Sequence, residues 1–254
     1  MSLNESEIRA FHSRLKESTR IRIQTAYQFT AEEIAKRTIS PVGTILDFGT
    51  YDGSFLPILL NIGKKVISFD YQWDKLAKAK AQENLQPYIL NKRLELLSAK
   101  AQDVAIAPES IDLATVFEIF GAGFIGTPDD VYRVFQHINR VLKPGSYCAL
   151  TVRSKTFDEM FAPLLPINVI DDSDFLVYRR DITPMLKEFG GTITWYGQTI
   201  YPHNKEVIFP VVTTRDQQFT GHAQWSSDAF KPRTIPDLTR ESPVYWLGIW
   251  QKPG

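Results

Sequence analysis

Between residues 43 and 152, short apolar runs of strand length alternate with segments of helical pattern. The runs that we interpret as strands are residues 44–48, 66–69, 94–97, 111–117 and 147–152. Strands joined through a helix lie parallel with a right-handed crossover, so repeated alternation builds a mostly parallel sheet with helices on both faces. This pattern predicts a doubly wound α/β domain, whose ligand binds beyond the carboxyl ends of the strands, where the strand order reverses.

Local signals mark the helices between these strands. A helix is predicted from about residue 54 to residue 62, and a second, rich in alanine and lysine, follows the strand of residues 66–69. Thr127 supplies an N-cap for a third helix, with a proline and two aspartates in its first turn. Pro144 and Gly145 then suit a type II turn into the next strand.

Residues 1–42 are predicted to form a helical cap ahead of this domain. Apolar side chains recur at helical spacing over residues 5–38, and Thr30 with Glu33 matches a capping box, which indicates that a second helix begins there. Five arginine and lysine residues lie between residues 9 and 22. A solvated helix face explains them, and so does an anion-contacting lid.

The domain of residues 43–254 is expected to end in antiparallel strands. A helix near residues 184–189 precedes a strand over residues 192–201, and a last strand covers residues 244–250. We interpret these two strands as an antiparallel hairpin at the sheet edge, which makes seven strands in all. Between them, residues 202–243 show no regular pattern and are interpreted as an irregular insertion that covers the site.

Composition excludes several classes of protein. The 29 lysine and arginine residues balance 29 aspartate and glutamate residues, so a uniformly basic nucleic-acid-binding protein is not expected. The single cysteine, Cys148, cannot form an internal disulfide, and no apolar run is long enough for a signal or a membrane span, which favours the reducing cytoplasm. The four histidines are scattered without metal-ligand spacing, so no metal site is expected.

The most informative segment is the loop after the first strand, residues 47–53, with the sequence DFGTYDG. A glycine directly after a buried strand lets the chain turn sharply and lets a ligand approach the backbone. A dinucleotide site needs G-x-G-x-x-G, but after Gly49 the second and third positions hold Tyr51 and Ser54. Because the tyrosine would intrude on a pyrophosphate, a nucleoside cofactor without phosphates fits the loop better.

This heptapeptide resembles the first motif of the class I S-adenosylmethionine-dependent methyltransferases, D/E-x-G-x-G-x-G. Asp47, Gly49 and Gly53 match it, and Tyr51 replaces the middle glycine. An aromatic residue followed by Asp-Gly also occurs in branches of the family, including proteins that look like tRNA wobble-uridine modifying enzymes.

Three further matches follow in the order that the family has. Asp70 ends the second strand, where the family places a carboxylate that accepts hydrogen bonds from both ribose hydroxyls. Asp112 begins the fourth strand, and residues 140–145 read RVLKPG, similar to the family signature R-V-L-K-P-G-G. The resemblance covers residues 43–152 and implies a Rossmann-like fold, S-adenosylmethionine as cofactor and methyl transfer as the activity.

The same resemblance implies a set of cofactor-binding residues in the loops after the first four strands. Lys100 stands where the family has an aspartate that binds the adenine amino group, and an ammonium cannot accept that hydrogen bond. Either Gln102 or Asp103 takes this role, or backbone groups and stacking hold the adenine. The implied residues are Asp47, Gly49, Thr50, Tyr51, Gly53, Asp70, Tyr71, Ala101, Gln102 and Phe117.

A methyl group on a sulfonium is already activated, so the protein has to align a nucleophile and exclude water. A general base is needed only for a protonated acceptor. The candidates are Glu118, His203 and His222. Glu118 is explained equally well as a solvated carboxylate at a strand end, and each histidine as an ordinary surface residue.

These observations predict an enzyme that moves a methyl group to an oxygen, nitrogen or carbon of a small-molecule acceptor. Residues 1–42 and 153–254 would form the acceptor pocket. One alternative is an RNA methyltransferase acting on tRNA, favoured by the basic N-terminal segment although the neutral net charge counts against it. The other is a non-catalytic methyltransferase-like binding protein, suggested by Tyr51 and Lys100.

Overall fold

The computed structural model describes residues 20, 23–38, 41–120, 125, 127–153, 179–200, 208–213, 219–222 and 245–254. Within these residues the strands join into one sheet. They are β1 (Val42–Phe48), β2 (Gly63–Asp70), β3 (Leu94–Ser98), β4 (Ile111–Val116), β5 (Leu142–Arg153), β6 (Thr192–Ile200), β7 (Ile208–Thr213), β8 (Phe219–His222) and β9 (Tyr245–Gln251).

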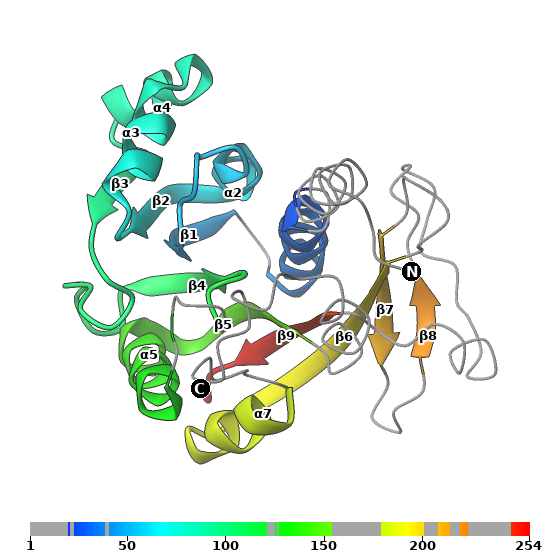
Figure 1. The fold of residues 1–254 in the computed structure, drawn as a ribbon. Coiled ribbons are helices and arrows are strands. Elements are labelled where there is room, and N and C mark those ends of the chain that lie inside the picture. Colours follow the sequence, from blue (N-terminus) through cyan, green and yellow to red (C-terminus); the bar gives the residue numbers. More distant parts are fainter. Residues whose placement is uncertain are drawn as a thin grey trace, which may run out of the picture.

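The order of the nine described strands is β3-β2-β1-β4-β5-β9-β6-β7-β8 (Figure 1). β1 pairs in parallel with β2 and β4, and the same direction continues into β3 and β5. β9 is antiparallel to both of its neighbours, β5 and β6. The expected doubly wound sheet of seven strands with an antiparallel C-terminal hairpin is thus confirmed, and β7 and β8 extend it.

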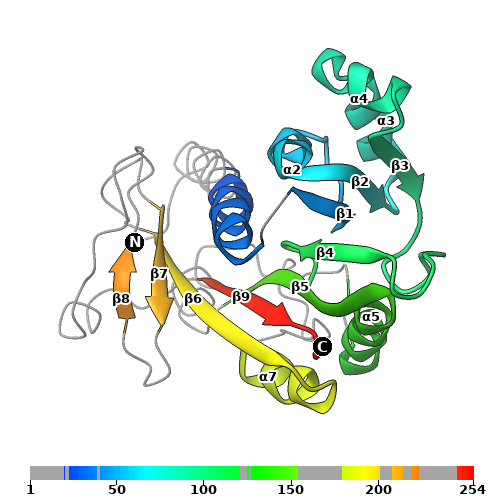
Figure 2. The ribbon, with the colours of Figure 1, turned by 180° about the vertical axis from the view of Figure 1, so that it is seen from behind.

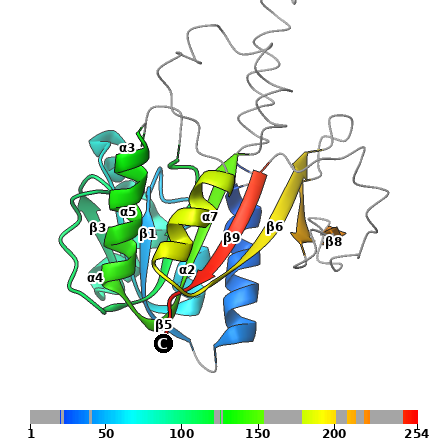
Figure 3. The ribbon, with the colours of Figure 1, turned by 90° about the horizontal axis from the view of Figure 1, so that it is seen from below.

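Helices cover both faces of the sheet (Figure 3). Phe135 of α5 and Leu186 of α7 share a buried cluster with Leu46 of β1, whereas Leu59 of α2 shares the opposite cluster with Ile45 of β1. Strand residues that alternate between the two clusters are what a strand covered on both faces requires. The labelled helices are α2 (Leu56–Ile62), α3 (Trp73–Ala81), the short 3₁₀ helix η1 (Glu83–Leu85), α4 (Gln86–Leu90), α5 (Pro128–Val141) and α7 (Arg179–Glu188).

The start of α5 is as predicted, whereas the start of β5 is not. Thr127 caps α5 as expected, since its hydroxyl oxygen accepts the N–H of Asp130. Gly145 has a left-handed φ of +76°, as the turn requires. However, β5 begins already at Leu142, and the Pro-Gly segment lies inside the strand, where the pairing of β5 with β4 shifts register.

The expected break at Thr30 is wrong. One helix continues through residues 23–37, which we call the N-terminal helix, and it lies between α2 and β6 in both views (Figures 1 and 2). Thr30 is fully buried inside it. The helix continues because Ala26, Phe29 and Ile34 form a buried stripe in the same cluster as Ile45 and Leu113 of the sheet, and tertiary packing of this kind outweighs a local capping signal.

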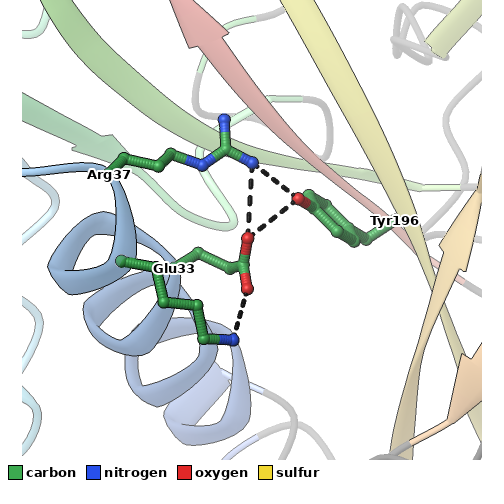
Figure 4. Close-up of polar contacts among 4 residues, drawn as sticks. Glu33, Arg37 and Tyr196 are labelled. Carbon is green, nitrogen blue, oxygen red and sulfur yellow. Dashed lines mark hydrogen bonds and ion pairs between the residues drawn. The ribbon is translucent and has the colours of Figure 1, made fainter.

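Glu33, the other half of the expected capping box, anchors this helix to β6 instead (Figure 4). Its carboxylate accepts hydrogen bonds from Lys36 at 2.7 Å, Arg37 at 3.3 Å and the hydroxyl of Tyr196 at 3.2 Å. Arg37 also donates to the Tyr196 oxygen at 2.8 Å, and Phe29 packs edge-on against the Tyr196 ring. We call Glu33, Arg37 and Tyr196 the helix anchor.

The expectation that residues 202–243 are irregular throughout is also wrong. Residues 208–213 and 219–222 form β7 and β8, which pair with each other, and β7 pairs with β6. Without β7, the backbone N–H and C=O groups along the outer edge of β6 would have no partners in the sheet. β7 pairs with them, and β8 pairs in turn with β7.

Candidate functional site

The order of the parallel strands reverses between β1 and β4, which is where a doubly wound sheet binds its ligand. Phe48 at the end of β1 is in register with Phe69 of β2 and Val116 of β4. The loops that follow these strands therefore meet at one edge of the sheet, and Asp70, in register with Ser98, brings the end of β3 to the same edge.

The loop after β1, residues 49–53, has an unusual backbone. Gly49, Tyr51 and Gly53 all adopt left-handed φ values, of +88°, +51° and +83°. The N–H groups of Gly49 and Thr50 both donate to the carbonyl oxygen of Phe69, which ties the start of the loop to β2. Two glycines spare the loop the strain that side chains would add at such angles, but Tyr51 carries it.

Gly53 has a packing role as well. A Cβ there would lie 2.9 Å from the Cβ of Ala79, so the absence of a side chain lets the loop lie directly against α3. A Cβ on Gly49 would lie 3.1 Å from Ile119. Of the two glycines, Gly53 serves the fit between loop and helix, and Gly49 lies next to the segment that follows β4.

Asp70 holds the loop from the side. Its Oδ2 accepts the N–H of Tyr51 at 3.0 Å, and its Oδ1 accepts the N–H of Gln72 at 2.9 Å. A carboxylate offers about four lone-pair directions, so each oxygen keeps a further acceptor site. Asp70 can therefore accept two more hydrogen bonds from a neighbouring diol without losing its grip on the loop.

The aromatic rings beside Asp70 are exposed. Tyr51 and Tyr71 expose 53% and 50% of their surface, and the Lys75 ammonium lies 4.4 Å from the centroid of the Tyr51 ring. The Tyr71 hydroxyl oxygen accepts the side-chain N–H of Gln72. The Tyr51 side chain thus lies against the first turn of α3.

Asp47 lies beneath the loop and is almost completely buried. Its Oδ1 accepts the hydroxyls of Tyr27 at 2.8 Å and Thr115 at 2.6 Å, and its Oδ2 accepts that of Ser68 at 2.7 Å. Burial raises the pKa of Asp47, although the three hydroxyl donors oppose the rise. Ser68 is 2.7 Å from the hydroxyl of Thr50, so Asp47 supports the loop through two hydroxyl groups.

Sequence reasoning missed Tyr27. It lies in the N-terminal helix, its ring packs edge-on against Phe117 at 4.6 Å and stacks on Phe55 at 5.4 Å, and burial together with the Asp47 charge raises its pKa well above the usual range. The only signal in the sequence was a tyrosine on an apolar helical stripe. Nothing local could show that its hydroxyl reaches a carboxylate 20 residues away.

The turn after β3 holds the residues expected near adenine. Ala101 and Gln102 are half-buried in a turn closed by the N–H of Asp103, which donates to the carbonyl of Lys100 at 3.0 Å, and Lys100 is exposed. The N–H of Ala99 donates to the Asp70 carbonyl, so this turn starts beside the end of β2.

The segment after β4 carries Phe117 and Glu118. Phe117 is buried against Tyr27, while Phe120 stacks on Phe135 of α5 on the opposite face of the sheet. Glu118 is half-buried with a left-handed φ of +59°. Its N–H donates to the Thr151 hydroxyl at 3.0 Å, and that hydroxyl donates to its carboxylate at 3.2 Å.

Of the two candidate histidines, the structure places only His222, and it is not near Glu118. His203 lies outside the described residues. His222 lies on β8, in register with Val211, and four strands separate β8 from β4. Since neighbouring strands are about 4.8 Å apart, five spacings amount to roughly 24 Å along the sheet.

Among the residues that the structure describes, no three His, Cys, Asp or Glu side chains gather closely enough to hold a metal ion. In the same ranges, no helix has the length and apolar character needed to cross a membrane.

Comparison with known proteins gives one family model and many solved structures that match this chain. Residues 46–150 match the family model described as methyltransferase domain. The matched segment runs from the end of β1 through most of β5 and contains every loop described above. No curated protein sequence is significantly similar to the chain.

Solved structures share the fold at low sequence identity. Magnesium protoporphyrin IX methyltransferase (ChlM) from Synechocystis PCC 6803, with bound SAH, has a TM-score of 0.58 at 11% identity and covers 99% of this chain and 89% of its own. The N-methyltransferase NodS from Bradyrhizobium japonicum WM9 has a TM-score of 0.51 at 12% identity, covering 95% and 98%. A possible exported protein from Bordetella parapertussis has a TM-score of 0.59 at 13% identity, covering 100% and 75%.

The strand order is that of the Rossmann-like methyltransferase fold, and the family model matches the segment that carries the switch point and its loop. The resemblance seen in the motifs is confirmed by the match of residues 46–150 to the methyltransferase domain model.

Proposed function

We propose that this protein transfers a methyl group from S-adenosylmethionine to a small-molecule acceptor. The observation that carries the proposal is the loop of residues 49–53 at the switch point, held beside a carboxylate, Asp70, that keeps two acceptor sites. A ribose presents two adjacent hydroxyl donors, which is the group this carboxylate fits.

The remaining contacts follow from the placement of the loops. The left-handed backbone of residues 49–53 would receive the amino-acid tail, and Tyr71 with the turn of Ala101 and Gln102 would hold the adenine through stacking and backbone groups, since the exposed Lys100 cannot accept a hydrogen bond. S-adenosylmethionine, when bound, supplies a methyl group already activated on a sulfonium.

Glu118 is the described residue best placed to serve the acceptor. It follows β4 at the switch point, and Thr151 fixes one of its carboxylate oxygens. Phe117, the residue before it, is buried edge-on against the ring of Tyr27. With a protonated acceptor Glu118 would take up the proton, and with a neutral amine it would only orient the nucleophile. His203 and His222 stay candidates from the sequence alone.

An exchange of Asp70 tests the cofactor assignment. We expect titration calorimetry to show binding of S-adenosylmethionine by the wild type and a loss of at least tenfold in affinity for Asp70→Ala, because the ribose hydroxyls lose a charged partner. Asp112→Ala is the matched control: Asp112 also accepts a backbone N–H, that of Thr44, but pairs with Lys143 near the start of β4. Equal affinity in all three proteins would contradict the assignment.

RNA remains the second candidate acceptor because of one observation. Tyr51, Tyr71 and Trp73 expose their rings, and the ammonium groups of Lys75 and Lys80 lie against the rings of Tyr51 and Trp73. Exposed rings with neighbouring cations can stack nucleobases. If RNA is the acceptor, filter binding of tRNA weakens steeply with salt and is reduced in Trp73→Ala. For a small-molecule acceptor we expect neither effect.

We place the reaction in the cytoplasm. The thiol of Cys148 is free and buried in β5, and burial raises its pKa far above the usual range, so it stays protonated and has no partner to form a disulfide with.

A further inference from the structure

A single buried carboxylate joins the N-terminal helix to three strands at the switch point. Asp47 belongs to β1, and its donors come from the N-terminal helix (Tyr27), β2 (Ser68) and β4 (Thr115). The helix anchor, by contrast, joins the same helix to β6.

The direction of each hydrogen bond follows from the number of protons. A hydroxyl has one proton, and the hydroxyls of Tyr27, Ser68 and Thr115 all donate to Asp47. Because Ser68 uses its only proton in the hydrogen bond to Asp47, Thr50 must be the donor to Ser68. The chain of hydrogen bonds runs from Thr50 in the loop through Ser68 to Asp47, and from the other side Tyr27 satisfies the same carboxylate.

The Tyr27 hydroxyl is not needed merely to dock the helix. The apolar stripe and the helix anchor already hold it on the sheet, and the Tyr27 ring keeps its contacts with Phe117 and Phe55 with or without the oxygen. What the hydroxyl adds is one of the two bonds to Oδ1 of a carboxylate that has no access to water. Losing it leaves that charge less compensated and loosens the group that supports Thr50.

We propose that Tyr27 is a positioning residue of the cofactor site, and that its hydroxyl acts through Asp47, Ser68 and Thr50 to hold the loop of residues 49–53 in its left-handed form. The N-terminal helix is then part of the site without touching the cofactor. The effect on cofactor affinity rests on the proposed function; the effect on loop order does not.

Two matched variants test this role. Tyr27→Phe removes only the hydroxyl that reaches Asp47, and Tyr196→Phe removes the hydroxyl of the helix anchor, which binds a carboxylate of the same helix but does not lead to the loop. Amide hydrogen exchange without ligand reports the order of residues 49–53, whose N–H groups are bonded to Phe69, Asp70 and Thr50. Titration with S-adenosylhomocysteine reports affinity.

In Tyr27→Phe we expect faster exchange in residues 49–53 and roughly tenfold weaker binding, the order of magnitude of one hydrogen bond to a charged group. In Tyr196→Phe we expect both to match the wild type, while residues 23–37 exchange faster. Unchanged loop exchange in Tyr27→Phe would overturn the proposal, and so would equal effects of the two variants, which would indicate helix docking in general. If the wild type itself does not bind, the proposed function is contradicted, and loop exchange alone decides the role of Tyr27.

Discussion

At the scale of single residues, the two carboxylates of the site show opposite solutions to the same task. Asp70 stays half-buried, uses one lone pair of each oxygen on the backbone and keeps the others for a ligand. Asp47 is buried, and its oxygens accept hydrogen bonds from three hydroxyl groups of the protein. Both hold the same loop, but only Asp70 is arranged to contact a ligand directly.

Substitution of Asp47 separates its hydrogen bonds from its charge. In Asp47→Asn the amide oxygen can still accept from Tyr27 and Thr115, while the amide nitrogen donates to Ser68, which turns to donate to Thr50. We expect urea denaturation to give a free energy of unfolding within about 1 kcal/mol of the wild type for Asp47→Asn, and a loss of roughly 3 kcal/mol or more for Asp47→Ala, which strands three buried donors. Equal losses in both variants would show that the charge itself is required.

The difference in stability between the wild type and Asp47→Asn should depend on pH in a direction that follows from the pKa of Asp47. Burial holds the pKa of Asp47 above its ordinary value of 3.8, so between 3.8 and the raised value the folded state binds more protons than the unfolded state. Wild-type stability relative to Asp47→Asn should therefore rise as the pH falls from neutral through this window, measured by denaturation at a series of pH values. A relative stability that falls instead would contradict the direction of the shift.

Residue-scale prediction succeeded where a position is defined by its neighbours in the chain. The turn after a buried strand and the carboxylate at the next strand end can be read locally, and Gly49, Gly53 and Asp70 lie where the motifs implied. Whether each binds the cofactor stays a prediction. Asp47 was recognised from the same motif, but its burial beneath the loop depends on Tyr27, which only folding brings there.

At the scale of elements, the helix anchor is the contact that secures the N-terminal helix to β6. Burial alone would raise the pKa of Glu33, but the hydrogen bonds and charges of Lys36, Arg37 and Tyr196 outweigh it and lower the pKa below its ordinary value of 4.5. A carboxylate with a lowered pKa stabilises the fold above that ordinary value, and the contribution is lost as the pH falls through the lowered value.

Glu33→Gln should therefore weaken the anchor at neutral pH. We expect a loss of about 1 kcal/mol in the free energy of unfolding and faster amide exchange across residues 23–37, because the charged acceptor of Arg37 is replaced by a neutral one. Glu32→Gln, on the exposed side of the same helix, is the control and should leave both unchanged. If Glu33→Gln and Glu32→Gln have the same free energy of unfolding, the helix anchor does not stabilise the fold.

The elements that sequence analysis described incorrectly share one cause. The capping box at Thr30 is a good local signal, but the helix continues because its apolar stripe packs on the sheet. β7 and β8 have no clear pattern of their own, and they form by pairing outward from β6. In both cases a contact with a distant segment decided the local structure.

At the scale of the whole molecule, cofactor binding should stabilise the fold. A ligand present at a hundred times its Kd adds about 2.7 kcal/mol. For a chain of this size each kcal/mol raises Tm by roughly 2–4 °C, so we expect S-adenosylhomocysteine to raise Tm by roughly 5–10 °C in a thermal scan. Asp70→Ala should lose most of this shift, and an unshifted wild type would speak against the proposed cofactor.

The sequence by itself determined the sheet of alternating strands and helices, the switch point and the loop with its neighbouring carboxylate. These are encoded by hydrophobic period, turn residues and short spacings, which act within a few residues of one another. The tertiary structure alone decided that one helix continues through residues 23–37. It also decided that the Tyr27 hydroxyl donates to Asp47 and that Glu33 contacts Tyr196, 163 residues away. Such contacts form only when the sheet brings remote segments together, because neither partner carries a local preference for the other.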